Sequence, residues 1–240
     1  MKRLACVTGR AILCALVVAA LSGCTALQRR SSAVERLAET YGVDRADQVE
    51  ELRYTFNVKI GDKVIRRSWN WAPASDRVTF DGSAEQGGRV SYARAALGAQ
   101  PPEQLKKVDA WFINDNYWLI FPWRVCWDRS AKVTEDPAPA PLPLGGGTAR
   151  RVVVSYPPSG GYTPGDDYEL FLDNSGRIVQ WVYRKGGDAK PTRVSTWEDY
   201  RRLGPLIVSM NRRGPDADFR VWFSDVAVRL KGRSDWTAPE

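Results

Sequence analysis

Residues 51–60 alternate between polar and apolar side chains at every position. Successive side chains of an extended chain point to opposite faces, so this stretch predicts a β-strand with one apolar and one polar face. A Gly-Asp turn signal follows at 61–62, and residues 63–71 again carry large apolar side chains on one face. The two stretches predict an antiparallel β-hairpin whose apolar face has to be buried.

Further stretches of the chain follow the same pattern, separated by turn signals such as 173–176 and 185–188. Two stretches, 31–41 and 102–113, instead repeat apolar residues at helical spacing. A sheet of about ten strands usually curls, and a curled sheet with helices in its mouth encloses a cavity. The eleven candidate strands are 51–60, 63–71, 76–81, 89–95, 117–127, 151–156, 168–173, 177–184, 193–197, 206–210 and 219–228.

Residues 111–123 hold six large aromatic side chains in a chain whose aromatic content is 11%. We predict that the second helix ends here, that Asn114, Asp115 and Asn116 form a corner, and that a strand begins at Tyr117. This strand is apolar on both faces, so one face would pack on structure and the other would meet the cavity. Ordinary core packing is the alternative. The expected cavity lining is Leu52, Tyr54, Phe56, Trp69, Trp71, Tyr117, Leu119 and Phe121.

The beginning of the chain resembles the export signal of a bacterial lipoprotein. Lys2 and Arg3 precede an apolar run at 11–21 that is too short to span a bilayer as a helix. The run ends in Leu-Ser-Gly-Cys, which resembles a lipobox. Cys24 is therefore the expected lipidation site.

This resemblance implies a domain organisation and a location. Residues 1–23 would be a lipoprotein signal peptide, 24–48 a lipidated N-terminus with a helix, and 49–240 the main domain. Two or more acyl chains anchor a protein firmly to a membrane. Thr25 follows the cysteine, instead of the Asp that marks retention in the inner membrane. We therefore expect a lipid-anchored protein on the periplasmic face of the outer membrane.

Composition excludes several classes of function. Residues 1–23 hold three basic residues and no acid, so their removal lowers the formal net charge from +7 to +4. The remaining charge is spread along the chain, which argues against nucleic acid as a partner. Histidine is absent, which removes nucleophile–His pairs and His metal ligands. Cys126 is the one thiol left after cleavage and lipidation, and we expect it to be a small buried hydrophobic residue rather than a nucleophile. We expect no catalytic residue, metal or cofactor.

The lipobox, the N-terminal helix and the antiparallel strands together resemble the LolA/LolB superfamily of periplasmic lipoprotein carriers and receptors. Segments 111–123, 160–168 and 222–226 resemble those of uncharacterised members of this group. The resemblance implies a mainly β (α+β) fold, a large antiparallel curled sheet that forms an unclosed half-barrel of about eleven strands. Two or three helices would cover its concave side, around a hydrophobic cavity for acyl chains. The LolA carrier is soluble, so the lipobox argues against a shuttle role.

The leading functional hypothesis is a membrane-anchored, non-enzymatic lipoprotein that binds lipid or acyl chains, with a lipoprotein or envelope protein as a further partner. The alternative is a module that binds an envelope glycan or protein, because tryptophan rings also stack on sugars. A carboxylate-dependent hydrolase comes third. Asp166 and Asp167 are adjacent, so on a strand they would point to opposite faces and form a poor acid–base pair.

Overall fold

The computed structural model describes residues 32–159 and 163–240. The predicted signal peptide and Cys24 lie outside the described residues. Two α-helices are present in the described part of the chain, α1 (Ala33–Tyr41) and α2 (Glu103–Trp127). Short 3-10 turns supplement them: η1 (Val43–Gln48), η2 (Ala84–Gln86), η3 (Arg94–Ala96) and η4 (Lys185–Gly187).

The strands of the described residues form two antiparallel sheets. In the larger sheet the order is β11 (Glu198–Leu203), β12 (Leu206–Arg213), β13 (Phe219–Leu230), β1 (Val49–Ile60), β2 (Lys63–Ala72), β3 (Arg77–Asp81) and β4 (Arg89–Ala93), with β14 (Trp236–Thr237) beside β13. In the smaller sheet the order is β10 (Arg193–Thr196), β9 (Ile178–Arg184), β8 (Asp167–Leu172), β7 (Thr148–Ser155) and β5 (Lys132–Glu135), with β6 (Ala140–Pro141) beside β7.

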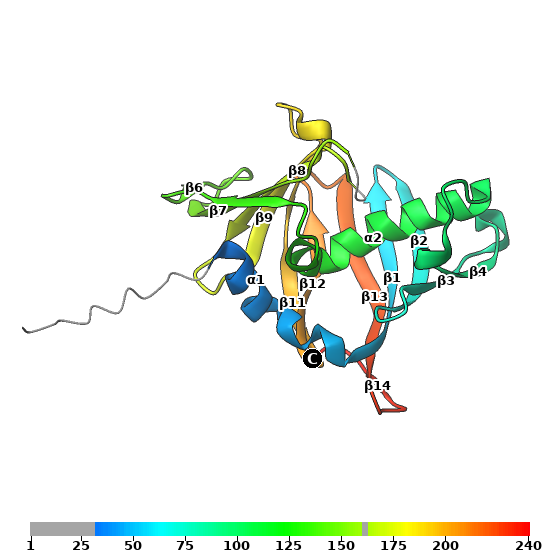
Figure 1. Ribbon diagram of the computed structural model, residues 1–240. Helices are drawn as coiled ribbons and strands as arrows, with labels where there is room; N and C mark the ends of the chain where they lie inside the picture. The colour runs from blue at the N-terminus through cyan, green and yellow to red at the C-terminus, as the bar shows by residue number, and fades with distance from the viewer. Residues whose placement is uncertain (1–31, 160–162) are drawn as a thin grey trace, which may run out of the picture. The chain divides into compact units, whose positions relative to one another are not determined.

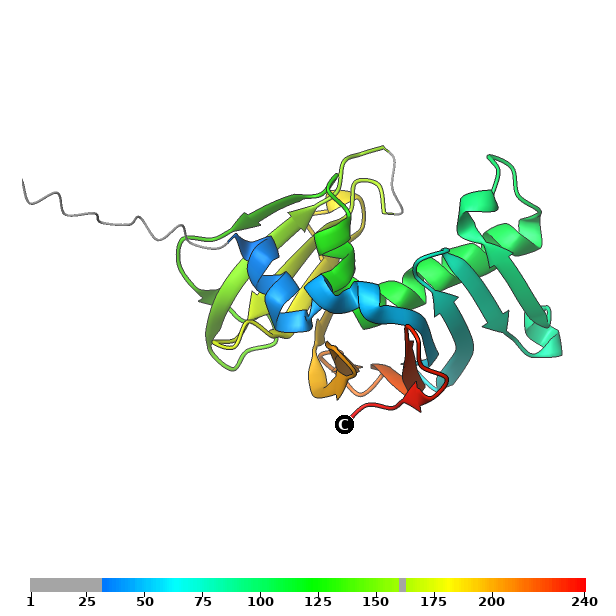
Figure 2. The same ribbon diagram turned by 60° about the horizontal axis from the view of Figure 1, so that its bottom comes forward.

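The two sheets meet where β10 bends into β11. Trp197 alone separates these strands, and its amide donates a 2.8 Å hydrogen bond to the carbonyl of Val179. Counted as one bent strand, β10–β11 completes a path of eleven strands, β5-β7-β8-β9-β10/β11-β12-β13-β1-β2-β3-β4. The strands curve around the long helix α2 without closing, and β4 and β5 end the path (Figure 2). The predicted fold class, a curled and unclosed antiparallel sheet, is confirmed.

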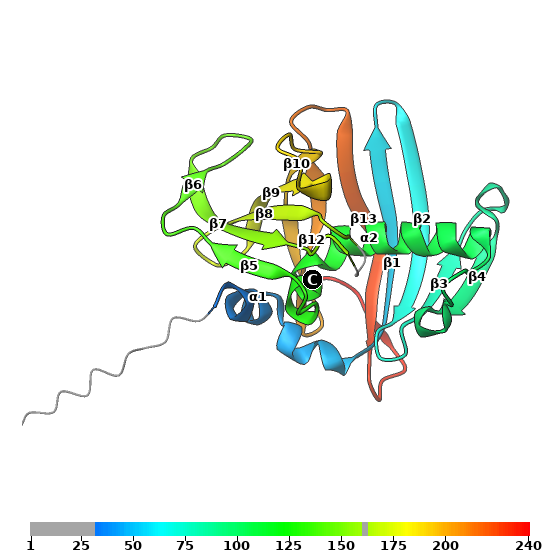
Figure 3. The same cartoon turned by 45° about the horizontal axis from the view of Figure 1, so that its top comes forward.

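The predicted strand at 117–127 is wrong. Residues 103–127 form the single helix α2, which crosses the concave face of the larger sheet (Figure 1; Figure 3). The predicted corner at 114–116 therefore lies within a helix. The helix is kinked at Ile120 (φ −121°, ψ 28°), two residues before Pro122, whose ring and missing amide disturb helical geometry.

Helix α1 forms close to the predicted range because both of its ends are capped. Ser32 and Glu35 make a reciprocal capping box at its beginning. Gly42 ends it in the left-handed conformation (φ 68°), and a Cβ there would come within 2.2 Å of the carbonyl oxygen of Pro205. Leu37 and Tyr41 are buried, so α1 contributes one apolar stripe to the core.

The core lies between α2 and the concave face of the sheet. Phe112 of α2 contacts Trp69 and Trp71 of β2, with ring centroids 5.4 Å and 6.0 Å apart. Beyond the kink, Phe121 contacts Trp181 of β9 at 5.3 Å. The helix thus joins the larger sheet to the smaller one through aromatic contacts, which contribute about 0.5–1.5 kcal/mol each beyond the area that they bury.

Candidate functional site

A cavity of about 700 Å³ lies on the concave side, between α2 and the ends of strands from both sheets. Its walls come from the β1–β2 hairpin, α2, the β7–β8 connection, β8, β9, the β9–β10 connection, the beginning of β10, and β13. Most of the lining is apolar or aromatic: Phe56, Val58, Ile60, Ile65, Ala110, Ile113, Tyr117, Trp118, Tyr168, Trp181, Tyr183, Phe219 and Val221. The polar lining residues are Arg67, Asn114, Thr163, Asp166, Lys185, Thr192 and Arg193.

Two of the eight residues expected to line the cavity, Phe56 and Tyr117, lie on its wall. The other six are buried in the core, each with at most 2% of its surface exposed: Leu52, Tyr54, Trp69, Trp71, Leu119 and Phe121. Those on β1 and β2 share the concave face with Phe56, as the alternation predicts. They lie further along these strands than Phe56, where α2 covers the sheet. There the rings of α2 fill the space, as the contact of Phe112 with Trp71 shows.

Sequence reasoning missed several wall residues, among them Trp118, Tyr168, Trp181 and Phe219. The tilted rings of Tyr168 and Trp181 have their centroids 5.4 Å apart, and the ring centroid of Trp118 lies 4.8 Å from that of Trp181. The predicted strand 177–184 contained part of the necessary signal, because Trp181 and Tyr183 stand at alternate positions and share one face. Nothing in the sequence indicated that β8 and β9 lie opposite the β1–β2 hairpin.

A buried ion pair holds α2 against β2 at the edge of the cavity. Arg67 donates from Nε and Nη2 to the two carboxylate oxygens of Asp115, at 2.6 Å and 2.5 Å. The Trp69 indole and the Asn114 amide donate to the same carboxylate at 2.9 Å and 3.0 Å. Burial raises the pKa of Asp115, while Arg67 and these hydrogen bonds act to lower it.

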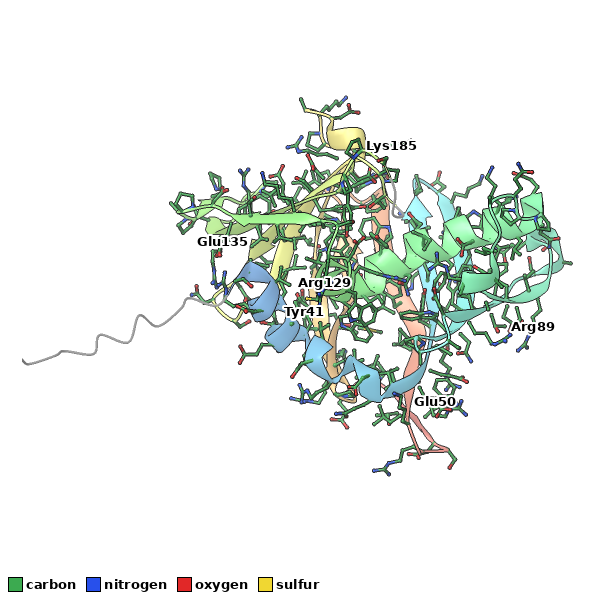
Figure 4. The ribbon with its side chains drawn as sticks, viewed as in Figure 1. Tyr41, Glu50, Arg89, Arg129, Glu135 and Lys185 are labelled. Atoms are coloured by element: carbon green, nitrogen blue, oxygen red, sulfur yellow. The ribbon has the colours of Figure 1, made fainter. Side chains whose placement is uncertain are left out.

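The carboxylate on the cavity wall, Asp166, is also engaged. It accepts the hydroxyl of Tyr183 at 3.0 Å and the amide of Gly186 at 2.8 Å. Asp166 therefore holds the connection that follows β9 in place. Lys185, labelled in Figure 4, is the first residue of this connection. The two carboxylates of the cavity region, Asp115 and Asp166, thus hold structural hydrogen bonds on separate elements.

Tyrosine hydroxyls near the cavity are neutral groups at physiological pH. Burial raises the pKa of Tyr117, Tyr168 and Tyr183, and nearby Asp166 raises the last two further. The hydroxyls of Tyr117, Tyr156 and Thr163 are buried without a hydrogen bond of regular geometry. Tyr156 and Thr163 lie close enough to Tyr117 to offset part of the increase that burial causes in the pKa of Tyr117. These groups can donate or accept hydrogen bonds but do not ionise.

Cys126 near the end of α2 is half-buried and free of any disulfide. Its thiol donates a 3.6 Å hydrogen bond to the carbonyl of Val34, and burial raises its pKa to about 11. A thiol with so high a pKa is a weak nucleophile at neutral pH. The placement agrees with the prediction of a small hydrophobe that packs in the core.

Among residues 32–159 and 163–240, no helix is long and apolar enough to cross a membrane. The same residues contain no group of three or more Cys, Asp or Glu side chains placed to hold a metal ion. The site is thus an aromatic cavity with basic and hydroxyl groups along its wall.

The fold and the cavity define an α+β half-barrel protein with a pocket of ligand size. Two solved structures resemble it over 85% of this chain. One is a DUF1329 family protein from Desulfovibrio piger, with a TM-score of 0.45, 12% identity and 94% of that chain covered. The other is a putative outer membrane lipoprotein-sorting protein domain from Vibrio parahaemolyticus, with a TM-score of 0.44, 10% identity and 95% of that chain covered. The sequence matches no family model and no curated protein.

Proposed function

We propose that this protein binds an acyl chain of a lipid or lipoprotein in the concave cavity. The observation that carries the proposal is the cavity itself, whose volume of about 700 Å³ falls within the range typical of small-molecule sites, about 300–1,000 Å³. Its walls come mainly from aromatic and aliphatic side chains of α2, β1, β9 and β13. Such walls favour a long apolar ligand over a polar one.

The driving force for this binding is the removal of methylene groups from water. Each buried methylene contributes about 0.8 kcal/mol, so a palmitoyl chain of about fifteen methylenes gains at most ~12 kcal/mol before the costs of ordering are subtracted. This gain depends little on the head group. We therefore expect the protein to bind acyl chains in general. Polar groups on the cavity wall would add further selectivity.

The proposed role also draws on two expectations from the sequence, the lipid anchor at Cys24 and the resemblance to LolA/LolB proteins. Acyl chains on Cys24 would tether the half-barrel to the periplasmic face of the outer membrane, next to lipid and lipoprotein ligands. A tethered protein with such a cavity would receive or hold an acylated molecule at that membrane, without enzymatic activity. Another envelope protein or a lipoprotein would then be its partner.

A fluorescent fatty-acid probe is expected to bind the purified protein and to be displaced by phospholipid or lipopeptide. Muropeptides and oligosaccharides should leave the probe in place, because they bury little apolar surface in an aromatic cavity. Fluorescence titration measures both binding and displacement. Displacement by the saccharides alone would contradict the proposal and favour the glycan alternative.

One observation favours that alternative. A second hollow, of about 660 Å³, lies on the polar outer face of the larger sheet. Arg53, Asn70 and Arg89 contribute to it, with Trp236 at its side. The Arg53 guanidinium lies 4.5 Å from the centre of the Trp236 ring, so that face of the indole is already occupied. The outer hollow is therefore the weaker candidate site.

Substitution of Cys24 by alanine is expected to leave an unprocessed or soluble protein that no longer fractionates with outer membranes. The reason is chemical, because the thiol of this residue is the proposed point of lipid attachment. Membrane fractionation at high salt is the measurement, with Cys126→Ala as the matched control. A Cys24→Ala protein that still sediments with outer membranes would exclude the lipobox.

A further inference from the structure

Arg212 of β12 is a fully buried cation with unmatched donors. Its exposed fraction is 0%, and its Nη1 donates to the carbonyl of Ser209 at 2.5 Å. Nε and Nη2 are buried without a hydrogen-bond partner. None of the ion pairs among the described residues includes Arg212. A buried charge without a counterion is costly, and burial lowers the pKa of Arg212 to about 9.

The side chains around this guanidinium supply two aromatic ring faces and further unpaired polar groups, but no carboxylate. Its central carbon lies 4.0 Å from the ring centre of Trp197 and 5.2 Å from that of Phe223. The indole nitrogens of Trp197 and Trp181 and the hydroxyl of Ser195 are likewise buried without partners. Ser195 lies opposite Trp181 in the β9–β10 ladder, and the rings of Trp181 and Trp197 are 5.4 Å apart. An unmatched donor group therefore extends from Arg212 towards Trp181.

The tyrosines near Arg212 are engaged with the backbone. The Tyr41 hydroxyl accepts the amide of Ile178 at 2.9 Å, and the Tyr200 hydroxyl donates to the carbonyl of Ile178 at 2.7 Å. The two hydroxyls are also hydrogen-bonded to each other at 2.8 Å. Figure 4 shows Tyr41 at the end of α1. Neither hydroxyl replaces the anion that the guanidinium lacks.

This group of donors lies directly behind the wall of the cavity. Arg212 is paired with Val221 across β12 and β13, and side chains at paired positions lie on the same face of a sheet. Val221 and Trp181 both line the cavity. Phe223 is 5.9 Å from the lining residue Phe56. One layer of side chains thus separates the guanidinium from the cavity.

We propose that the cavity takes an acyl or alkyl chain with an anionic end, a carboxylate or a phosphate, and that this end reaches Arg212 when the side chains between the guanidinium and the cavity move aside. The proposal rests on the proposed acyl-binding function. The edge formed by Nε and Nη2 suits two oxygens of one anion, because a guanidinium binds such groups through two parallel hydrogen bonds. Arg67 of the same protein uses this edge, Nε and Nη2, to hold both oxygens of Asp115.

An anionic end could instead stay at the mouth of the cavity. Lys185 lines the cavity from the β9–β10 connection and Arg193 from the first position of β10. The Arg193 guanidinium lies 4.1 Å from the ring centre of Phe219. Neither Lys185 nor Arg193 belongs to an ion pair among the described side chains. Arg193 is half-buried and Lys185 is exposed, so solvent screens their charges and weakens any contact. The buried and unscreened Arg212 is the stronger site for an anion.

The experiment compares ligands that share one chain length and differ only in charge. Palmitate and hexadecyl phosphate carry the anion, whereas hexadecanol and methyl palmitate do not. Calorimetry with the purified protein should show the anionic ligands binding at least about tenfold more tightly, as expected for a hydrogen-bonded charge in a buried site. Arg212→Met should remove this preference and keep the affinity for hexadecanol.

Three variants locate the anion. Arg212→Met should fold, because it replaces an unmatched buried charge with an apolar side chain of similar length. Arg212→Lys should lose most of the preference, because an ammonium cannot hold two oxygens in parallel. Arg193→Gln is the matched control and should keep the preference. If Arg193→Gln removes the preference instead, or if the natural protein binds palmitate and hexadecanol equally, the inward orientation is overturned and acyl binding stands. If none of the four ligands binds, the proposed function itself fails.

Discussion

Replacing Asp115 by alanine is expected to lower the free energy of unfolding by about 3–5 kcal/mol. The Asp115 carboxylate has 0% of its side-chain surface exposed and receives both donors of Arg67. Its removal leaves a buried guanidinium and the Trp69 indole without an acceptor, so the penalty is that of an uncompensated charge and not of one hydrogen bond. Urea unfolding followed by tryptophan fluorescence measures the loss.

Two controls separate this effect from a general cost of losing an ion pair. Asp136→Ala breaks the pair between Asp136 and Arg151, both about a third exposed, and should cost at most about 1 kcal/mol. The double variant Arg67→Met/Asp115→Leu should regain most of the stability, because burial already disfavours the charged form of Asp115. A double variant as unstable as Asp115→Ala would contradict this explanation.

Phe121→Ala is expected to cost about 3–5 kcal/mol of unfolding free energy and to leave probe affinity nearly unchanged. Phe121 is fully buried and contacts Tyr168 at 4.5 Å and Trp181 at 5.3 Å. Its loss leaves a void between α2 and the smaller sheet. Chemical denaturation and the fluorescent fatty-acid titration, performed on the same preparation, measure the two quantities.

Trp118→Ala is the matched variant from the same helix. Trp118 lines the cavity and is only partly buried, so its loss should cost about 1–2 kcal/mol of stability. Probe affinity should fall about tenfold, which corresponds to 1.4 kcal/mol of binding free energy. If both variants lose stability equally and bind the probe normally, then this part of α2 is ordinary core and the cavity does not hold the acyl chain.

The sheet could be predicted from the sequence because its strands carry local signals. Residues 51–60 alternate strictly, and the structure places a strand at Val49–Ile60 with the expected hairpin partner. Strands without alternation were missed, such as β5 with one half-buried residue and β11 with a polar surface. For these segments, pairing with β7 and β12 supplies the stability that the local sequence does not indicate.

The helix between 114 and 127 was missed because much of it is buried on all sides. A stretch that is apolar on all sides has no period by which a strand can be told from a buried helix. Pro122 was the available signal, because proline disfavours the interior of a paired strand. Asp115 and Asn116 indicated a turn by their chemistry, yet both are fully buried within α2. The arginine that balances Asp115 lies 48 residues away in sequence.

The candidate site was predictable only in part for the same reason. Alternation identified the face of β1 and β2 that points inward, and Phe56 lies on the cavity wall as expected. It did not indicate which part of that face α2 covers. Arg212 gave no signal at all, because an arginine among the three polar residues that end 206–213 has the same sequence pattern whether it faces solvent or the core.

The pairing of β1 with β13 also determines when the protein can fold during its synthesis. Ile60 lies opposite Phe219 and Val49 opposite Leu230, so these neighbours are separated by most of the chain. Contacts so distant in sequence form slowly, because a long loop has to close before they contribute free energy. A ribosome that delivers the chain from its N-terminus leaves one edge of β1 unpaired until residue 219 has emerged. Chaperones that hold the unfolded chain, during synthesis or during the proposed export, would therefore have to protect this unpaired strand edge until residues 219–230 are available to pair with it.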